Sequence, residues 1–404
     1  MNDLVIVGAG LSGLLAANFA ARRGASVTLV AQGRGGLSLS HGCLGLGSVV
    51  ENPGAFPARH PYRQADPDKL YPAITEFQQL SASEGLEFVG DPQTALQLPT
   101  ASGGLLSVHF APRSLAQGSL SNSDKICIAG IDGFRDFEPG LVVHGLRRRG
   151  HQAEATSLPL PSGAPGRDLY STDIASAFDR DWPRREIAHL WAPHFTKADR
   201  VGMPAVLGIA HSWEILTTLQ AELGLQFFEI PTLPPSVPGL RLERVLRRAA
   251  LASGCRVLEG PMATGRIDGT SGGAQALGVS TWTPAGPRVV DAGAVVLATG
   301  GALNGGWRAT RAGRIHESVF DFPISAPEDR EAWIGERLIG PHPYDRFGLA
   351  VNARMQPCDS DGRPFFANVF ACGGLLGGAD RRTEGSREGI DLVTAYAAVE
   401  AALA

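Results

Sequence analysis

The sequence predicts an α/β fold in which a Rossmann-like nucleotide-binding domain is interrupted by an inserted α+β domain. The first thirty residues read as strand, glycine turn, helix and strand. Two further glycine turns follow apolar runs, at 299–301 and 373–378. Between the first turn and these, the composition changes and prolines become frequent. A chain of 404 residues is long enough for two domains.

The opening unit carries a dinucleotide fingerprint. The apolar, β-branched run Leu4–Val7 is typical of a buried strand, and residues 8–13 read Gly-Ala-Gly-Leu-Ser-Gly. Apolar residues at helical spacing follow from 14 to 23, and 27–30 form a second strand. In this pattern Gly8 allows the tight turn, Gly10 lets the backbone approach a pyrophosphate, and Gly13 lets helix pack on strand. The helix N-terminus would then bind the pyrophosphate.

One part of the fingerprint is missing. An acidic residue is expected near the end of the second strand, where it would bind the ribose. This chain has Ala31, Gln32 and Gly33 instead. Gln32 could hydrogen-bond a ribose hydroxyl, whereas Arg34 could meet a 2′-phosphate. The strand end therefore leaves the identity of the nucleotide open.

The composition excludes several classes of protein. Charged residues make up 19% of the chain and apolar residues 44%, which indicates a folded protein. A formal net charge of −4 gives no nucleic-acid footprint. The five cysteines include no C-x-x-C pair, which argues against a zinc site and a disulfide framework and fits a reducing cytoplasm. A strand that begins at Leu4 leaves no room for a signal peptide, and no apolar run reaches the length of a membrane span.

The middle of the chain predicts the insertion. A glycine- and serine-rich loop, 33–47, can bring backbone close to a ligand. Helical stretches such as 67–84 then alternate with short strands such as 125–129, and the proline-rich segment 231–238 reads as the return connection. The predicted boundaries are 1–50, 240–310 and 341–404 for the nucleotide-binding domain, and 51–239 and 311–340 for the inserted substrate or cap domain.

From residue 240 the nucleotide-binding domain resumes. We expect a helix over 242–253 and a strand over 255–258, followed by strands at 276–283, 288–291 and 294–298. The last of these leads into Thr299-Gly300-Gly301. A strand over 369–372 precedes the third glycine turn, and a helix over 389–403 closes the chain. The start of that helix would direct a second positive helix end at the site.

The three glycine elements together resemble those of two-domain flavoprotein oxidoreductases related to fumarate reductase. Segments 130–137, 229–239, 314–320 and 370–378 narrow the resemblance to the family of B-type subunits of anaerobic glycerol-3-phosphate dehydrogenase. This resemblance implies a flavin, FAD by the fingerprint, with FMN as the alternative. It also implies a catalytic flavoprotein subunit and an iron–sulfur subunit as partners, with contact to the inner membrane only through a partner. Family members carry several glycines after the last Gly-Gly turn, whereas residues 384–389 here read Glu-Gly-Ser-Arg-Glu-Gly.

The expected cofactor-binding residues come from all three glycine elements and from the loop after the second strand. They are Gly8, Gly10, Leu11, Ser12, Gly13, Gln32, Gly33, Ser40, Gly42, Thr299, Gly300, Gly301, Gly373, Gly374, Gly385 and Ile390.

Catalysis needs a base for a hydroxyl proton and an arginine for an anionic substrate. The candidates are His41, His109, Arg113 and His211, with His342 as a further histidine of the return segment. His41 lies close to where some fumarate-reductase relatives attach flavin covalently, although a polar contact is the commoner role of a histidine. Three hypotheses stay open: a subunit of a glycerol-3-phosphate:quinone oxidoreductase-like complex, a self-contained flavin dehydrogenase for a small hydroxy or amino acid, and a non-catalytic flavin-binding assembly subunit.

Overall fold

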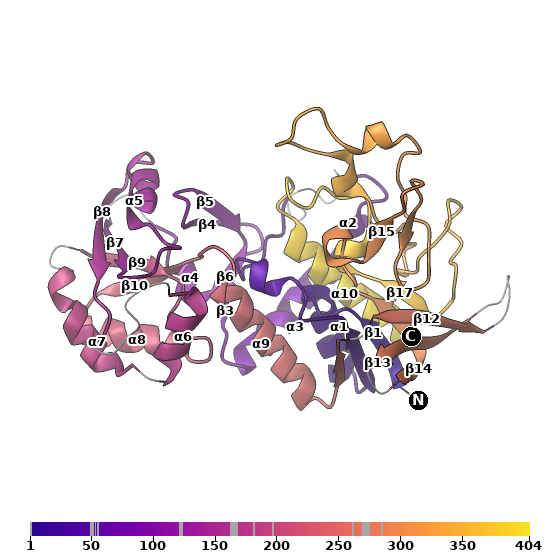
Figure 1. Cartoon of the computed structure of the whole chain (residues 1–404), viewed down its shortest axis with the longest axis horizontal. Coiled ribbons are helices and arrows are strands. Elements are labelled where there is room, and N and C mark those ends of the chain that lie inside the picture. The colour runs from indigo at the N-terminus through magenta and orange to yellow at the C-terminus, as the bar shows by residue number, and fades with distance from the viewer. Residues whose placement is uncertain are drawn as a thin grey trace. The chain divides into compact units, whose positions relative to one another are not determined.

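The chain divides into two compact units in a computed structural model, which describes residues 2–48, 52, 54, 56–120, 124–161, 169–180, 182–195, 198–260, 262–268, 275–283 and 286–404 (Figure 1). Unit 1 comprises Met1–Gly36, Gly45–Leu80 and Leu246–Ala404. Unit 2 comprises Leu37–Leu44 and Ser81–Val245.

Unit 1 is built on one sheet, seven-stranded within the described ranges, whose central strands are parallel. Its order is β11-β2-β1-β14-β13-β12, and β17 also pairs with β14. The strands are β1 Asn2–Val7, β2 Val27–Ala31, β11 Arg256–Glu259, β12 Ala263–Asp268, β13 Gln275–Thr283, β14 Gly286–Leu297 and β17 Val369–Ala371. Val7 lies opposite Val30 on one side and Leu297 on the other, so these strands end at the same edge.

β14 is a single strand where the sequence predicted two. Its first half pairs with β13 antiparallel, from Gly286 to Asp291, and its second half pairs with β1 in parallel, from Ala292 to Leu297. Ala292 and Gly293 keep the chain extended between the two halves. The two short apolar runs are therefore one strand that serves two partners.

Helices α1 (Leu11–Arg22) and α10 (Arg387–Leu403) pack on each other over this sheet. Their contact includes an edge-on pair of the Phe19 and Tyr396 rings, 5.4 Å apart. The helix turns α2 (Pro61–Gln64) and η3 (Pro67–Lys69) also pack on α10. Burial of these apolar faces is what the helical spacing predicted.

Two segments expected in the inserted domain lie in unit 1. Residues 51–80, which include the start of α3 (Leu70–Ser83), are held there by ion pairs of Arg22 and Arg23 with Glu76 and of Lys69 with Glu400. Residues 311–340 are also in unit 1. They contain part of the hairpin of β15 (Trp307–Ala309) and β16 (Ile315–Glu317), which follows directly on the second glycine turn. Conversely, Leu37–Leu44 and residues 240–245 belong to unit 2.

Unit 2 has its own parallel sheet, four-stranded in the part of the chain that the structure describes, in the order β10-β9-β7-β8. The strands are β7 Lys125–Ile131, β8 Gln152–Leu158, β9 Arg200–Pro204 and β10 Gln226–Ile230. Its helices are α4 Arg113–Ala116, α5 Pro139–Arg147, α6 Ser171–Arg180, α7 Arg184–Trp191 and α8 Ser212–Leu223. Trp191 and Phe227 are among the large side chains fully buried in its core. Two short antiparallel pairs complete the unit, β3 (Phe88–Gly90) with β6 (Phe110–Pro112) and β4 (Leu96–Pro99) with β5 (Leu105–Val108).

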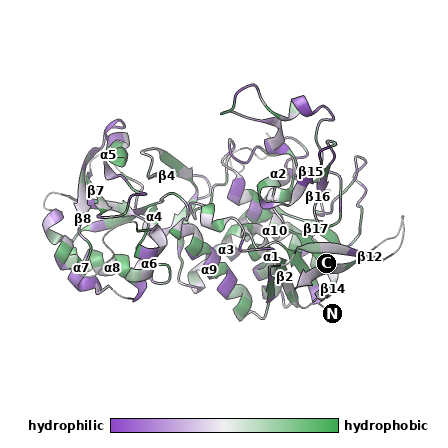
Figure 2. Cartoon of the chain, viewed as in Figure 1, coloured by the Kyte–Doolittle hydropathy of each residue, from purple (hydrophilic) through white to green (hydrophobic). Residues whose placement is uncertain are grey.

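The helix α9 (Val237–Ala252) begins earlier than the predicted helix. Pro238 lies in its first turn, where a missing N–H costs nothing. Figure 2 shows that helices α7 and α8 contain both hydrophobic and hydrophilic residues, as partly exposed helices do. No helix in the described ranges combines the length and the apolar character that a bilayer span requires.

Candidate functional site

The carboxyl ends of β1, β14 and β17 bring the three glycine elements of unit 1 to one edge of the sheet. β1 continues through α1 to β2 on one side, while β14 lies on its other side. In open α/β sheets ligands bind outside the carboxyl ends at such a reversal of strand order. Two segments far apart in the sequence therefore meet at one crevice: the turn after Val7 and the turn after Leu297.

The three fingerprint glycines have different surroundings. A Cβ atom on Gly8, whose φ is +113°, would lie 2.2 Å from the carbonyl oxygen of Ala298, and one on Gly13 would lie 1.8 Å from the carbonyl oxygen of Gly8. A Cβ atom on Gly10 would have no neighbour within 4 Å. Gly8 and Gly13 are thus required by packing inside the protein. Gly10 faces open space at the N-terminus of α1, where a bound group can approach the backbone.

The loop after β2 closes on the same turn. Gly35, with φ of +76°, packs so that a Cβ atom would lie 2.7 Å from the Cα atom of Gly10. Our sequence reasoning missed this residue, although the Gly35-Gly36 pair in a glycine-rich loop could have indicated it. Gln32, the predicted ribose contact, and Gly33, also expected to bind the cofactor, are exposed, and the Gln32 side chain has no hydrogen bond to another described residue. Its amide is therefore available to a ligand.

The second and third glycine turns lie against each other. A Cβ atom on Gly301 would be 3.3 Å from the carbonyl oxygen of Gly374, so these two backbones run in near contact. Gly300 has a φ of +77°. The Oγ1 atom of Thr299 is buried without a hydrogen-bond partner among the described residues. An orphaned hydroxyl beside two glycine backbones is what a polar ligand would be expected to satisfy.

A polar network joins the start of α1 to the third turn and to α10. The Ser12 hydroxyl donates to Asp391 Oδ1 at 2.9 Å, and Arg381 forms an ion pair with the same oxygen. Gly373, with φ of +70°, sits where a Cβ atom would be 1.9 Å from Ser12 Oγ. Its N–H donates to Thr394 Oγ1 at 2.9 Å. Asp391 and Arg381 were not predicted; the only signal was a carboxylate on the buried face of the last helix.

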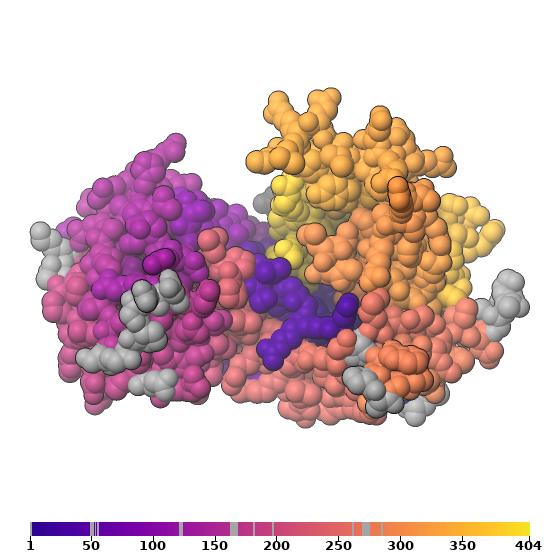
Figure 3. Space-filling view, in the orientation of Figure 1, coloured from indigo at the N-terminus to yellow at the C-terminus, as the bar shows by residue number. Residues whose placement is uncertain are grey.

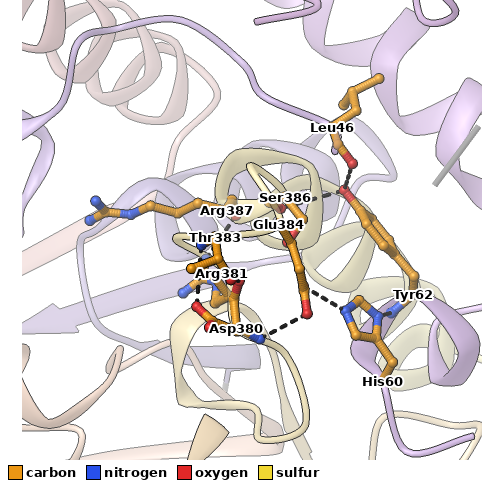
Figure 4. Close-up of polar contacts among 9 residues, drawn as sticks. All are labelled: Leu46, His60, Tyr62, Asp380, Arg381, Thr383, Glu384, Ser386 and Arg387. Carbon is orange, nitrogen blue, oxygen red and sulfur yellow. Dashed lines mark hydrogen bonds and ion pairs between the residues drawn. The ribbon is translucent and has the colours of Figure 1, made fainter. Parts of the chain in front are cut away.

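The loop between β17 and α10 is held by residues 60–62 (Figure 4). His60 is fully buried, and its Nε2 atom lies 3.1 Å from Glu384 Oε2. Its Nδ1 atom accepts the N–H of Tyr62 at 3.2 Å, so the proton of the neutral ring is on Nε2 and is donated to Glu384. The Tyr62 hydroxyl donates to the carbonyl of Leu46 at 2.8 Å and contacts that of Ser386 at 3.4 Å.

Glu384 is the centre of this loop. Besides the contact with His60, it accepts the N–H of Asp380 at 3.0 Å and the Ser386 hydroxyl at 3.1 Å. Burial opposes the charge of Glu384, but hydrogen bonds from His60 and from the Asp380 N–H outweigh it, so the pKa of this carboxyl is lowered. The loop that begins α10 is therefore fixed by an ionised carboxylate.

The side chains of the segment 384–389 have different surroundings. Glu388 is buried and accepts the N–H of Gly45 at 3.2 Å, which ties the start of α10 to the loop after residue 44. Arg387 is exposed. Gly385 keeps the open backbone of the pattern, with φ of +61° and no neighbour within 4 Å, and Ile390 is fully buried.

The four catalytic candidates lie in unit 2, and several of them already contact other residues of that unit. Arg113 forms an ion pair with Glu87 at 2.9 Å, and its guanidinium lies 4.5 Å from the centre of the Trp213 ring. His211 precedes α8 with its side chain 54% exposed. His41 Nδ1 accepts the N–H of Cys43 at 3.1 Å, and the His109 N–H donates to the Leu44 carbonyl at 2.9 Å.

His41 and His109 thus lie on neighbouring segments, because the backbone of His109 is hydrogen-bonded to Leu44. Arg113 and His211 both lie beside helix α8, Arg113 through its contact with Trp213. Ser40 and Gly42, expected at the cofactor, also belong to unit 2, where Ser40 Oγ accepts the N–H of Gly42 at 3.1 Å. His342 lies in unit 1 and accepts the N–H of Gly335 at 3.0 Å.

The residues of unit 1 fit a flavin dinucleotide. The fingerprint offers an open backbone at Gly10 and the N-terminus of α1 for a pyrophosphate, and no acidic side chain stands in the first turn of that helix. Thr299 and the apposed backbones of Gly301 and Gly374 offer polar groups at the neighbouring strand ends. Thus the donors lie at the ends of three neighbouring strands, as an extended two-part cofactor requires.

Comparison with known proteins agrees with this assignment. The FAD binding domain family matches residues 3–389 of the chain. A probable B-type subunit of anaerobic glycerol-3-phosphate dehydrogenase from Halobacterium salinarum is 31% identical over 99% of this chain and 97% of its own length. The corresponding B-type subunit from Vibrio cholerae serotype O1 is 28% identical over 100% of this chain and 96% of its own length. Among solved structures, the open conformation of a flavocytochrome c3 fumarate reductase aligns with 100% of this chain and 79% of its own, at 12% identity and a TM-score of 0.44.

Proposed function

Because this chain belongs to the FAD binding domain family and, within it, to the B-type subunits of anaerobic glycerol-3-phosphate dehydrogenase, we propose that it is the flavin-bearing B-type component of a multi-subunit glycerol-3-phosphate dehydrogenase. The chain is an FAD-dependent oxidoreductase of the α/β class. The observation that carries the proposal is the end-to-end similarity to these relatives, which extends over 97% of the length of the Halobacterium protein.

Unit 1 would hold the cofactor. When bound, FAD supplies two-electron redox chemistry. Gly10 and the first turn of α1 would bind the pyrophosphate, Gln32 the ribose, and Thr299, Gly301 and Gly374 the remaining polar groups. The N-terminus of α10 would place a positive helix end beside the cofactor.

In the alternative in which this chain oxidises a hydroxy substrate by itself, unit 2 would supply the groups that act on it. A hydroxy substrate bearing a phosphate needs a proton acceptor and a cation. His41, His109 and His211 are proposed for the proton and Arg113 for the anion. Since Arg113 already pairs with Glu87, binding of a substrate phosphate would require that carboxylate to release it.

The partners follow from the proposed complex. We propose that electrons pass from this chain through an iron–sulfur subunit, alongside a second, substrate-oxidising flavoprotein subunit. On this proposal the chain is cytoplasmic and reaches the inner membrane only through those partners.

The test is anaerobic reduction of the flavin in the tagged protein, purified from its native host with and without a salt wash that strips partners. We expect two further chains to co-purify, one of them with an iron–sulfur spectrum, and glycerol 3-phosphate to bleach the flavin absorbance only while they are present. Bleaching of the stripped chain by this substrate would instead establish a self-contained dehydrogenase. A stripped, colourless chain that rebinds no FAD would overturn the proposal.

Acid precipitation of the same preparation separates two forms of attachment. Release of free FAD into the supernatant is the expected result, because a polar contact is the commoner role of a histidine such as His41. Colour that stays in the pellet, together with a flavin-modified peptide containing His41, would show covalent attachment.

A further inference from the structure

A second pocket lies in unit 1, away from the fingerprint and the second glycine turn and bordered by the end of the third. It has a volume of about 340 Å³, which is within the range of small-molecule sites. Its walls are the backbone of residues 348–352 and 377–378 and a set of polar side chains. The side chains that matter here are Arg59, Gln64, Ser325, Arg346, Cys358 and Ser360. Figure 3 shows the segment from about 325 to 345, in orange, at the surface of the molecule.

Gly378 fixes the two arginines at the same wall. Its N–H donates to the carbonyl of Arg346 at 2.9 Å. A Cβ atom on Gly378, whose φ is +96°, would lie 2.6 Å from the carbonyl of Arg59. The main chains that carry both arginines are therefore packed against one glycine. Only a residue without a side chain allows this approach.

Both guanidinium groups are unengaged. Neither Arg59 nor Arg346 makes a side-chain hydrogen bond or ion pair with another described residue. Arg363, a near neighbour in sequence of the pocket lining, differs in this respect because it pairs with Asp361 at 3.4 Å. Two arginines without an ion-pair partner, against the single carboxylate of Asp359, leave the recess with a net positive charge that attracts an anion. The planar guanidinium group suits the oxygens of a phosphate or carboxylate.

The acidic residue of the lining is occupied by its own turn. Asp359 Oδ1 accepts the N–H groups of Asp361 and Arg363, both at 2.9 Å. Cys358, beside it, is 8% exposed. Burial raises the pKa of the Cys358 thiol, and the charge of Asp359 adds to this, while the charge of Arg59 acts in the opposite direction.

We propose that this pocket binds a compact dianion, such as a phosphate group or a small dicarboxylate, between Arg59 and Arg346. The pocket is separate from the fingerprint and from the second glycine turn, since no residue of 8–13 or 299–301 lines it, and it meets the third turn only at Gly377 and Gly378. Anion binding here is independent of which substrate the flavin oxidises.

The experiment is isothermal titration of the FAD-loaded protein with inorganic phosphate and, separately, with malonate, at constant ionic strength. We expect one of the two to bind saturably with one equivalent, and Arg59→Gln and Arg346→Gln each to weaken it at least about tenfold. The matched control is Arg311→Gln, which removes an exposed arginine of unit 1 that has no side-chain partner among the described residues and does not line the pocket. Phosphate preference would indicate a phosphorylated ligand and malonate preference a dicarboxylate.

The proposal would be overturned if neither anion bound saturably, or if Arg311→Gln weakened binding as much as the pocket variants. A second readout guards against a variant that fails to fold. Because Cys358 lines the pocket and the other four cysteines are at most 5% exposed, the bound anion should slow alkylation of Cys358 by iodoacetamide in the native protein. Unchanged alkylation under saturating anion would place the ligand elsewhere. Since the flavin absorbance of each variant is recorded in the same sample, loss of anion binding is separable from failure of the flavin assignment.

Discussion

The fingerprint glycines differ in what a methyl group would meet. Gly10→Ala should leave the folded chain nearly unchanged, because its φ of −76° and ψ of −172° are accessible to alanine and no atom lies within 4 Å of the new Cβ. The methyl group would occupy the space through which a pyrophosphate approaches the backbone. We expect FAD to bind at least about tenfold more weakly, equivalent to about 1.4 kcal/mol. Fluorescence titration of the apoprotein with FAD measures this.

Gly13→Ala is the comparison. Its methyl group would lie 1.8 Å from the Gly8 carbonyl oxygen, so backbone must move, at a cost of about 1–3 kcal/mol of folding stability or more. The midpoint temperature of thermal unfolding of the apoprotein should therefore fall for Gly13→Ala and remain unchanged for Gly10→Ala. Wild-type FAD affinity in Gly10→Ala would contradict the assignment of the pyrophosphate to this turn.

Glu317 gives unit 1 a pH-dependent stability. This side chain is fully buried and accepts the N–H groups of Val319 at 2.8 Å and Phe320 at 2.7 Å. Burial raises its pKa to about 7 from 4.5, although the backbone hydrogen bonds act the other way. A raised native pKa means that the native state holds the proton more tightly, so stability is fully present below about pH 4.5 and is lost as the pH rises through about 7.

Glu317→Gln removes this titration. Between pH 5 and pH 8 the wild type should lose about 2.5 kcal/mol relative to the variant, which is most of the effect expected from the difference of the two pKa values at about 1.4 kcal/mol per unit. Urea unfolding of both proteins across this range is the measurement. A difference between them that stays constant with pH would show that Glu317 does not titrate in the native state.

At the scale of elements, the start of α10 depends on contacts that are far apart in sequence. The Ser12–Asp391–Arg381 network and the His60–Glu384 pair hold it from two sides. Each long-range pair fixes a loop whose own residues form few regular hydrogen bonds. This arrangement accommodates the side chains at 384 and 388 within unit 1: Glu388 accepts the Gly45 N–H, and Glu384 contacts the buried His60.

Glu384→Gln tests one side of this arrangement. Glu384 has a lowered native pKa, so its contribution to stability is present above the unfolded pKa near 4.5 and is lost as the pH falls through the native value. The wild type should exceed the variant in stability at pH 7, and the two should converge as the pH falls below about 4.5. Glu328→Gln, an exposed glutamate of unit 1 without a side-chain partner among the described residues, is the control. The measurement is chemical unfolding of the wild type and the variants at pH 7 and pH 4. If the difference in unfolding free energy between wild type and Glu384→Gln does not shrink in acid, the role of Glu384 is one of packing alone.

The strands and helices at the cofactor edge were predictable because their signals are local. The apolar run before Gly8, the glycine at 24 and the helical spacing of 389–403 each fix a short element. The junction of 288–291 with 294–298 was not predictable, because only the partners β13 and β1 reveal that one strand continues. Asp391, Arg381 and His60 escaped notice for the same reason: their roles arise from partners in distant segments.

At the scale of the whole molecule, the sequence predicted an insertion but not its extent. Prolines and turn residues indicated where the composition changes, whereas membership of a unit depends on tertiary contacts. Residues 51–80 join unit 1 through ion pairs of Glu76 and Lys69 with distant helices. The parallel sheet of unit 2 likewise cannot be read from strands as short as β9, since pairing direction is a long-range property.

Two units with separate cores should respond differently to removal of the cofactor. Any ligand that binds only the native state stabilises it by about 2.7 kcal/mol at a hundredfold excess over the Kd. All the cofactor residues of the three glycine turns belong to unit 1, while the large buried cluster around Trp191 and Phe227 belongs to unit 2. Differential scanning calorimetry of the whole chain should therefore show two transitions, of which only one rises in temperature with added FAD. Gly10→Ala is the matched control, in which that transition should rise less at the same FAD concentration. A single transition that shifts as a whole would mean that the units unfold together, and a response confined to the core of unit 2 would show that the flavin does not bind in unit 1.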